Sequence, residues 1–245
     1  MLFYSSFTAF AERISKSGFE RDDKLMTKQK NIKILPIYLI AFYGLWSLAE
    51  LVIFERIDLL TENEILNRFI IDVVIKNLVW TLPAVVLIYR FKDDVYITLK
   101  QMFSSRVNWL KYIPIFLFFT VYILGAAMLQ NGKLEIVSSF GFDDIIDVLF
   151  VGITEELVFR GWLLNVMFKE DKKWRCIFIN SLLFLLIHFP CWIQEGVFVS
   201  NFTSFSFLCL IMLSVIFSYT FIKSKNILVP IALHMYWDLL MFMLF

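Results

Sequence analysis

The sequence predicts an all-α membrane protein, a polytopic bundle of about seven transmembrane helices with its N-terminus inside and its C-terminus outside. Of the 245 residues, 60% are hydrophobic and 28 are Phe, and the mean hydropathy of +0.74 lies outside the usual range for soluble domains. Apolar runs that can cross a hydrocarbon core of ~30 Å recur along the chain. The connections between them alternate between rich and poor in Lys and Arg, which is typical of multi-pass proteins.

Seven apolar runs are each long enough to span the membrane at ~1.5 Å per residue. They cover residues 34 to 54, 69 to 90, 110 to 130, 143 to 168, 174 to 194, 203 to 222 and 226 to 245. We divide the chain into a basic cytoplasmic N-terminal segment, three variable transmembrane helices, and a core of four helices that carries the candidate site. These parts are residues 1–33, 34–142 and 143–245.

The orientation follows from the basic residues outside the predicted spans. With Arg90, Lys111 and Arg175 at the span edges counted in the neighbouring connections, their numbers are seven before the first span, then two, five, one, four, none, two and none in the successive connections and the tail. By the positive-inside rule, the N-terminus and the connections 91–109, 169–175 and 223–225 are cytoplasmic. Apart from those edge residues, just two basic residues, Lys76 and Arg160, fall within spans.

The N-terminal segment has an apolar stripe at helical spacing, formed by Phe3, Phe7, Phe10 and Ile14. It predicts either an interfacial helix lying on the membrane or a frayed terminus. The basic character of the segment is compatible with the plasma membrane of a bacterium.

Several function classes leave no signature in the chain. There is no P-loop, dinucleotide fingerprint, nucleic-acid-binding module or internal repeat. The three cysteines, Cys176, Cys191 and Cys209, lie in or beside apolar spans without CxxC spacing, so we interpret them as packing residues. The expected partners are membrane lipid and a peptide or protein substrate, with no nucleic acid.

Ionisable residues inside a membrane are candidates for function, because each charge there costs a few kcal/mol or more. Two sites in the first half have a structural explanation. Glu50 lies near the outer end of its span and can reach water, and Asp72 and Lys76 stand four residues apart and can pair on one helical face.

The run TEELVFRGWLL brings three charged residues into the fourth span. Glu156 and Arg160 stand four residues apart, so they share a face and can neutralise each other. Glu155 points about 100° away around the same helix. We expect Glu156 and Arg160 to form a pair that makes burial tolerable, which leaves Glu155 to meet other polar groups.

Those groups come from two later spans. The chain has two histidines, His188 and His234, and His234 stands four residues before Asp238. Counted from the predicted span ends, Glu155 and Asp238 both lie ~18 Å along their helices and thus near the middle of the membrane. His188 lies ~21 Å along its helix, and a later start of that helix would bring it to the same depth. The four side chains are therefore expected to converge.

Three motifs in these spans resemble the family of CAAX proteases and bacteriocin-processing enzymes, abbreviated CPBP and also called Abi, which includes the Ras-converting CAAX endopeptidases. The first motif reads E-E-L-V-F-R-G from Glu155 to Gly161, the second F-L-L-I-H from Phe184 to His188, and the third H-M-Y-W-D from His234 to Asp238. One motif alone is weak, but three in the family's order on separate spans are specific. The resemblance covers about residues 143 to 245.

The resemblance implies an intramembrane endopeptidase, with four catalytic and two bracing side chains. The catalytic residues would be Glu155, His188, His234 and Asp238, and the bracing residues Glu156 and Arg160. In this scheme Glu155 is the general base that activates a water, and His188 holds the same water. His234 with Asp238 would face the scissile carbonyl and stabilise the oxyanion.

Asp238 departs from the pattern of the Ras-converting members, which have Asn at this position. An Asn amide donates hydrogen bonds, whereas an Asp donates only when it is protonated. Either Asp238 is protonated beside Glu155, or it acts by orienting His234. The difference weakens the transfer of a strictly CAAX-specific activity to this chain.

The same four residues also permit a metal site. Glu155, His188, His234 and Asp238 form an acceptable zinc ligand set. However, HExxH is absent, and the nearby Arg160 disfavours a cation. We therefore expect a mechanism that requires no cofactor, with zinc as the alternative.

The sequence thus favours a peptidase whose substrate is a prenylated protein of the CAAX type, or a membrane-associated precursor such as a bacteriocin or signalling leader. A role in bacteriocin self-immunity is a variant of this function. The alternatives are a proton-coupled transporter and an inactive scaffold of the same fold. A transporter is expected to distribute polar residues across the bilayer and often to show repeats, whereas here they cluster in the C-terminal spans.

Overall fold

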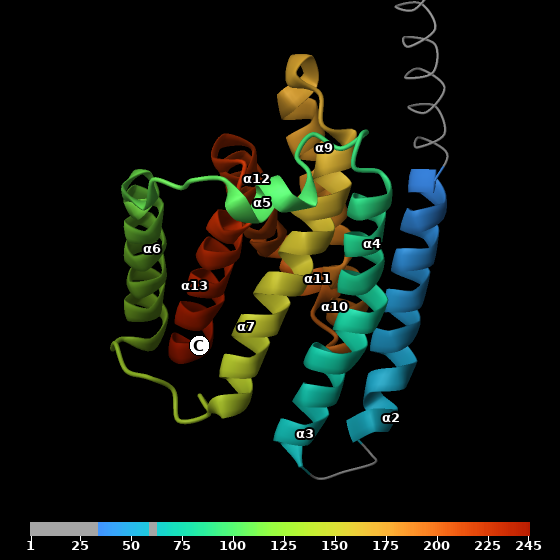
Figure 1. Cartoon of the computed structure of the whole chain (residues 1–245). Coiled ribbons are helices and arrows are strands. Elements are labelled where there is room, and N and C mark those ends of the chain that lie inside the picture. The colour runs from blue at the N-terminus through green and yellow to red at the C-terminus, as the bar shows by residue number, and fades with distance from the viewer. Residues whose placement is uncertain (1–33, 59–62) are drawn as a thin grey trace, which may run out of the picture. The chain divides into compact units, whose positions relative to one another are not determined.

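The computed structural model describes residues 34–58 and 63–245, and all regular structure in these residues is helical (Figure 1). The predicted all-α fold class is therefore confirmed. The basic N-terminal segment 1–33, with its proposed interfacial helix, lies outside the described residues. The structure divides the chain into two units at Ala41, and the packing described below is that of the second unit, Phe42–Phe245.

Two long helical stretches make up the first part of the described chain. The first runs over Ile34–Ile53 and continues into α2. The second begins where the Asn63 side chain accepts a hydrogen bond from the Leu66 backbone N–H at 3.1 Å, an N-cap that satisfies a free donor of the first turn. The elements are η1 (Ala49–Ile53), α2 (Phe54–Asp58), α3 (Glu64–Arg68), η2 (Phe69–Ile75), η3 (Asn77–Thr81) and α4 (Leu82–Arg90).

The remaining helices follow after a short connection. Three successive elements, α7 (Phe142–Glu156), the π-helical η5 (Leu157–Leu164) and α8 (Asn165–Met167), form one continuous helix. The elements are α5 (Leu99–Ser104), η4 (Trp109–Lys111), α6 (Ile113–Asn131), α7 (Phe142–Glu156), η5 (Leu157–Leu164), α8 (Asn165–Met167), η6 (Glu170–Lys172), α9 (Lys173–Leu186), α10 (His188–Gln194), α11 (Phe198–Thr203), α12 (Ser206–Ser224) and α13 (Leu228–Leu244).

Five described helices are long and apolar enough to cross a membrane. They are Ile34–Ile53, Ile65–Arg90, Ile113–Asn131, Glu170–Gln194 and Ser206–Ser224. Two further predicted spans are also helical, but α13 is shorter, at 17 residues, and the helix that begins with α7 carries several acidic residues. The total of seven spans and the orientation stay predictions.

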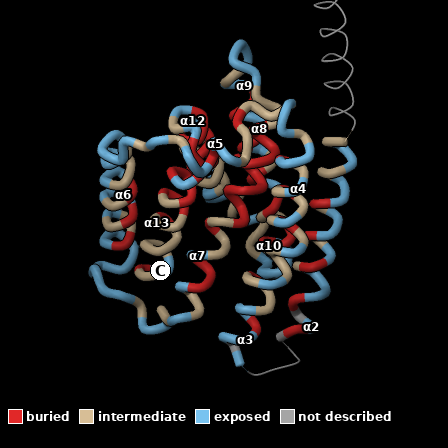
Figure 2. Tube along the Cα trace, in the orientation of Figure 1, coloured by how far each residue is buried: buried red, intermediate tan, exposed pale blue. Residues whose placement is uncertain are grey.

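The helix that contains η5 is the centre of the second unit. All eight residues of η5 are buried, which is typical of a helix surrounded by others. It packs against α4, α9 and α12, while α7 packs against α13 (Figure 1). Figure 2 shows the buried positions concentrated along this helix and on the inner faces of its neighbours. Its charged residues are therefore enclosed by other helices.

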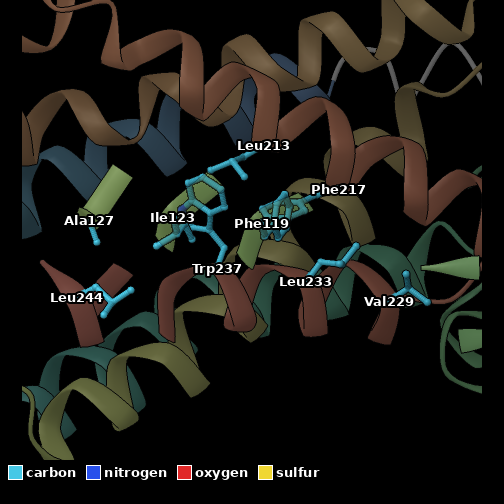
Figure 3. Packing of buried hydrophobic residues seen from close by; sticks show 9 residues of the cluster. All are labelled: Phe119, Ile123, Ala127, Leu213, Phe217, Val229, Leu233, Trp237 and Leu244. Carbon is cyan, nitrogen blue, oxygen red and sulfur yellow. The ribbon is translucent and has the colours of Figure 1, made fainter. Parts of the chain in front are cut away.

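A cluster of apolar side chains joins α6, α12 and α13 beside this central helix (Figure 3). The Trp237 ring of α13 meets Phe119 of α6 edge-on, with ring centroids 5.0 Å apart, and stacks on Tyr122 at 5.6 Å. Such aromatic pairs contribute beyond the apolar area that they bury. The buried members of the cluster are Phe119, Ile123, Ala127, Leu213, Phe217, Val229, Leu233, Trp237 and Leu244.

A glycine permits the close approach of α7 and α13. A Cβ at Gly152 would lie 2.6 Å from Cγ of Met235 and 3.6 Å from its backbone N. Any side chain at this position therefore has to displace Met235. Gly152 lies one helical turn before Glu155 and Glu156, and Met235 follows His234. The spacing of the two helices at Gly152 thus controls the spacing of the candidate site residues.

We expect Gly152→Leu to destabilise the protein by about 1–3 kcal/mol, because overpacking forces neighbouring side chains or helices to shift. The measurement is the thermal unfolding midpoint of the purified protein in detergent. Gly125→Leu is the matched control, since Gly125 also lies inside an apolar helix but has no atom within 4 Å of an added Cβ. Equal destabilisation by the two substitutions would contradict the proposed close approach.

Candidate active site

Glu155 and Glu156 are the last two residues of α7, directly before the π-helical segment η5 that contains Arg160. Glu156 and Arg160 are fully buried, and 8% of Glu155 is exposed. Single π-helical turns inside α-helices are rare and occur often at functional sites. The motif E-E-L-V-F-R-G thus lies at an irregular point of the central helix.

The Arg160 guanidinium is bound through its two terminal nitrogens by polar groups inside the bundle, and two aromatic rings pack against it. Nη1 donates to Oε1 of Glu156 at 2.8 Å, and Nη2 donates to the Ser214 side-chain oxygen at 2.8 Å and to its backbone carbonyl at 3.2 Å. The guanidinium carbon lies 4.6 Å from the Phe184 ring centroid and 5.3 Å from that of Phe217. Arg160 thereby connects the central helix to α9 and α12. The expected pairing of Glu156 with Arg160 is confirmed.

His234 of α13 shares the Glu156 carboxylate with Arg160. Its Nδ1 lies 2.9 Å from Oε1 of Glu156, the same oxygen that Arg160 contacts. Because a carboxylate paired with a guanidinium only accepts hydrogen bonds, Nδ1 of His234 has to carry the proton. The other ring nitrogen, Nε2, then faces Glu155 Oε2 at 3.8 Å and Asp238 Oδ2 at 3.4 Å.

The exposure of these side chains rises from one side of the cluster to the other. The Glu156 and Arg160 side chains are 0% exposed, His234 is 7%, Glu155 is 10% and Asp238 is 21% exposed. Glu156 and Arg160 therefore form the closed base of the site. Glu155, Asp238 and Nε2 of His234 lie on the side that a water or a substrate can reach.

His188 lies beside this cluster and is connected to it through Phe184. Its Nδ1 is 3.1 Å from the Phe184 carbonyl, which can only accept, so Nδ1 donates and Nε2 is the acceptor atom of the neutral ring. The Phe184 ring lies 5.2 Å from the His188 ring and 6.0 Å from the His234 ring, measured between centroids. Both histidines thus hold Nδ1–H in a fixed hydrogen bond.

The two helical stretches before α5 also reach the site. Trp46 donates from Nε1 to the carbonyl of Ile187, the residue before His188, at 2.9 Å. The amino group of Lys76 lies 5.6 Å from the Trp46 ring centroid and is paired with Asp72, which confirms that expected pair. These helices, for which the sequence motifs gave no role, therefore hold the segment that carries His188.

The structure brings five of the six predicted site residues into one connected cluster: Glu155, Glu156, Arg160, His234 and Asp238. Sequence reasoning missed the hydrogen bond between Glu156 and His234, and it missed Ser214. Ser214 belongs to no motif, and a serine in an apolar helix is a weak signal. The expectation that Glu155 would meet His234 and Asp238 agrees with the distances above.

Among residues 34–58 and 63–245, no group of three or more His, Cys, Asp or Glu side chains is arranged to hold a metal ion. The zinc alternative stays a prediction, and the chelation experiment below addresses it.

An apolar cavity of about 740 Å³ lies between α6, α12 and α13. Trp237 and Met241, which lie one residue before and three residues after Asp238, form part of its wall. Ala126 and Met212 line it from α6 and α12. The cavity therefore lies directly beside the part of α13 that carries Asp238.

The model of a family described as type II CAAX prenyl endopeptidase Rce1-like matches residues 138–240. Residues 138–240 are therefore similar to the members of this family. The matched segment includes all three Rce1-like motifs, from Glu155 to Asp238. The five apolar helices and this match together identify the chain as an integral membrane protein with an Rce1-like segment. No curated protein and no solved structure matches the chain.

We expect Arg160→Ala to lower the free energy of unfolding by about 3–5 kcal/mol, because it leaves the buried Glu156 carboxylate without its cation. The measurement is the loss of folded protein on heating in detergent, followed by size-exclusion chromatography.

Lys133→Ala is the control for this prediction. Lys133 is also paired with a carboxylate, that of Glu135, but both side chains are about 60% exposed, so its removal should change stability little. If Arg160→Ala were as stable as Lys133→Ala, the buried pair would not support the site in the way described here.

Proposed function

We propose that the protein is an intramembrane endopeptidase that hydrolyses a peptide bond with a water activated by Glu155. The arrangement of the two adjacent glutamates carries this proposal. Glu156 is engaged by Arg160 and by Nδ1 of His234 at the closed base of the site. Glu155 lies on the accessible side, opposite Nε2 of His234. Glu155 is therefore the carboxylate that a water can approach.

In the proposed reaction, Glu155 takes a proton from the water while the water oxygen attacks the carbonyl carbon of the substrate. His188 holds this water through Nε2, which is an acceptor in the neutral ring. The attack gives a tetrahedral intermediate whose oxygen is negatively charged. When the C–N bond breaks, Glu155 returns the proton to the leaving nitrogen. No other reactant than water is consumed.

His234 and Asp238 are proposed to stabilise the oxyanion. Nε2 of His234, once protonated, is a donor between Glu155 and Asp238, 3.8 and 3.4 Å from their oxygens. Glu156 fixes the ring from the opposite nitrogen, so the donor is oriented before the substrate binds. A preorganised donor of this kind commonly contributes a factor of about 10²–10³ in rate.

The substrate is proposed to be a prenylated protein of the CAAX type or a membrane-associated peptide precursor, such as a bacteriocin or signalling leader. The description of the matched family supports the first class. The apolar cavity beside Asp238 supports a substrate with a hydrocarbon chain, because it can take such a chain near the reacting bond. A bacterial plasma membrane and a role in bacteriocin self-immunity are compatible with this function.

We expect Glu155→Gln and His188→Ala to reduce the cleavage rate by about 10²-fold or more, since each removes a group that handles the attacking water. The measurement is the cleavage of farnesylated and unmodified peptides by the purified protein reconstituted in lipid, with and without a chelator.

Glu135→Gln, in the loop after α6, is the control for expression and reconstitution, because Glu135 is exposed and distant in sequence from the motifs. Cleavage that persisted in Glu155→Gln and His188→Ala would refute the proposed site. Activity lost with the chelator and restored by zinc would instead favour the metal alternative.

We expect Ala126→Trp to raise the KM for a farnesylated peptide about tenfold, because it fills the apolar cavity that is proposed to hold the isoprenoid. Each CH₂ group of the isoprenoid that is no longer buried lowers the binding free energy by ~0.8 kcal/mol, so exposure of about two such groups accounts for a tenfold change. Cleavage of an unmodified peptide should not change.

Val121→Trp is the matched control, since Val121 lies on the same helix but is 72% exposed and is not part of the cavity wall. An equal effect of Ala126→Trp on both peptides, or an equal effect of the two substitutions, would rule out the cavity as the binding site of the lipid chain.

A further inference from the structure

A second pocket, distinct from the active site, lies between the start of α6 and the last turns of α12. Its volume is about 410 Å³, and residues of the ranges 106–115 and 219–224 line it. Three of the lining side chains are cationic, those of Arg106, Lys111 and Lys223, and none is acidic. The remaining lining includes the hydroxyl groups of two tyrosines, a threonine and a serine, as well as an asparagine amide.

Within residues 34–58 and 63–245, no ion pair balances the positive charge of this basic pocket. In the described part of the chain, the ion pairs of Lys and Arg lie elsewhere, and none includes one of the three cations. A fourth cation lies close by, because the amino group of Lys173 is 4.3 Å from the ring centroid of the lining residue Tyr219. Cations gathered without a counter-charge repel one another and attract an anion.

The basic pocket belongs to an end of the bundle that is positively charged as a whole. The segments 90–112, 167–175 and 222–228 carry 11 Lys and Arg against 4 Asp and Glu, which gives a net charge of 11 − 4 = +7. Two of these segments are joined directly, since Asn226 donates to the Ser105 carbonyl at 2.7 Å. The amino group of Lys225 lies 5.5 Å from the Tyr96 ring centroid. An anionic membrane surface would be attracted to this end.

The basic pocket also lies where the apolar surface of the protein begins. Trp109, Leu110 and Ile113, which alternate with pocket residues along the chain, are 44%, 73% and 45% exposed. Trp is enriched at the level of the lipid headgroups, and Lys and Arg extend toward the same level. The pocket therefore opens at the boundary between the headgroups and the hydrocarbon core.

We propose that this basic pocket binds the phosphate-bearing headgroup of an anionic phospholipid. Arg106, Lys111 and Lys223 pair with the phosphate oxygens, and the hydroxyl groups of Tyr112 and Ser224 add polar contacts to the headgroup. The acyl chains lie against the exposed apolar surface of α6. The proposal goes beyond the peptidase function and does not depend on it.

The test is a titration of the full-length protein in a mild non-ionic detergent with phosphatidylglycerol or phosphatidylcholine. Bound lipid is counted by native mass spectrometry, and stabilisation is followed as the shift in Tm. Phosphatidylglycerol is expected to bind and to raise the Tm of the wild type more than phosphatidylcholine does. The triple variant Arg106→Gln, Lys111→Gln, Lys223→Gln should lose at least roughly half of that shift.

A second triple variant, Lys92→Gln, Lys100→Gln, Lys169→Gln, removes the same charge from the same end but leaves the pocket unchanged, and it should keep the shift. Equal losses in both triple variants would overturn the proposal in favour of diffuse attraction. A lack of preference for phosphatidylglycerol would also overturn it. Inorganic phosphate and glycerol 3-phosphate are expected to give no shift, and a shift by either that the pocket variant abolishes would identify a soluble phosphate ligand instead.

If the pocket variant has a lower Tm than the wild type without lipid, the double variant Lys111→Gln, Lys223→Gln replaces it in the same comparison. Retention of the full phosphatidylglycerol shift by this double variant would overturn the assignment of the pocket.

Discussion

The Glu156 carboxylate is the interaction on which the rest of the site depends. One of its oxygens accepts from Arg160 and from His234, and Arg160 in turn donates to Ser214. A single buried anion therefore joins the central helix, α12 and α13. Buried charges are tolerated only when they are paired and hydrogen-bonded. The Glu156 charge is thus also what holds the His234 ring in one tautomer and directs Nε2 toward Glu155 and Asp238.

The helices before α5 contribute to the site through the backbone rather than through reacting groups. Trp46 donates to the carbonyl of Ile187, at the point where α9 ends and α10 begins. Ile187 caps the N-terminus of α10, so the indole of the first helix binds the backbone at the junction between the two helices. The position of His188, the next residue, is therefore determined by a side chain of the first helix as well as by α9.

The sequence was sufficient for the fold class, for the approximate place of the long apolar helices, and for the pairs Glu156–Arg160 and Asp72–Lys76, because these depend on hydropathy and on a spacing of four residues. The short helices α5 and α11 fall in predicted connections and were not expected. The contact between Glu156 and His234 could not be predicted, since the distance between two helices and the rotation of each about its axis are set by packing. Gly152 sets that distance for α7 and α13, but a glycine in an apolar helix does not by itself indicate a close contact between helices.

The predicted spans 143–168 and 226–245 are helical, but they differ from the other five spans. The first contains several acidic residues, and the helix α13 in the second has 17 residues.

The π-helical segment η5 constrains the length of the central helix as well as its composition. A π-helical turn contains more residues than an α-helical turn, so η5 places extra residues in a helix that is otherwise α-helical. On one side of it, Glu156 has to meet His234; on the other, Asn165 has to bind the backbone of Ile97 through both its oxygen and its nitrogen. Loss of one residue from η5 would rotate these two ends by about 100° relative to each other. Homologous chains should therefore vary the residue types between the two contacts more readily than their number.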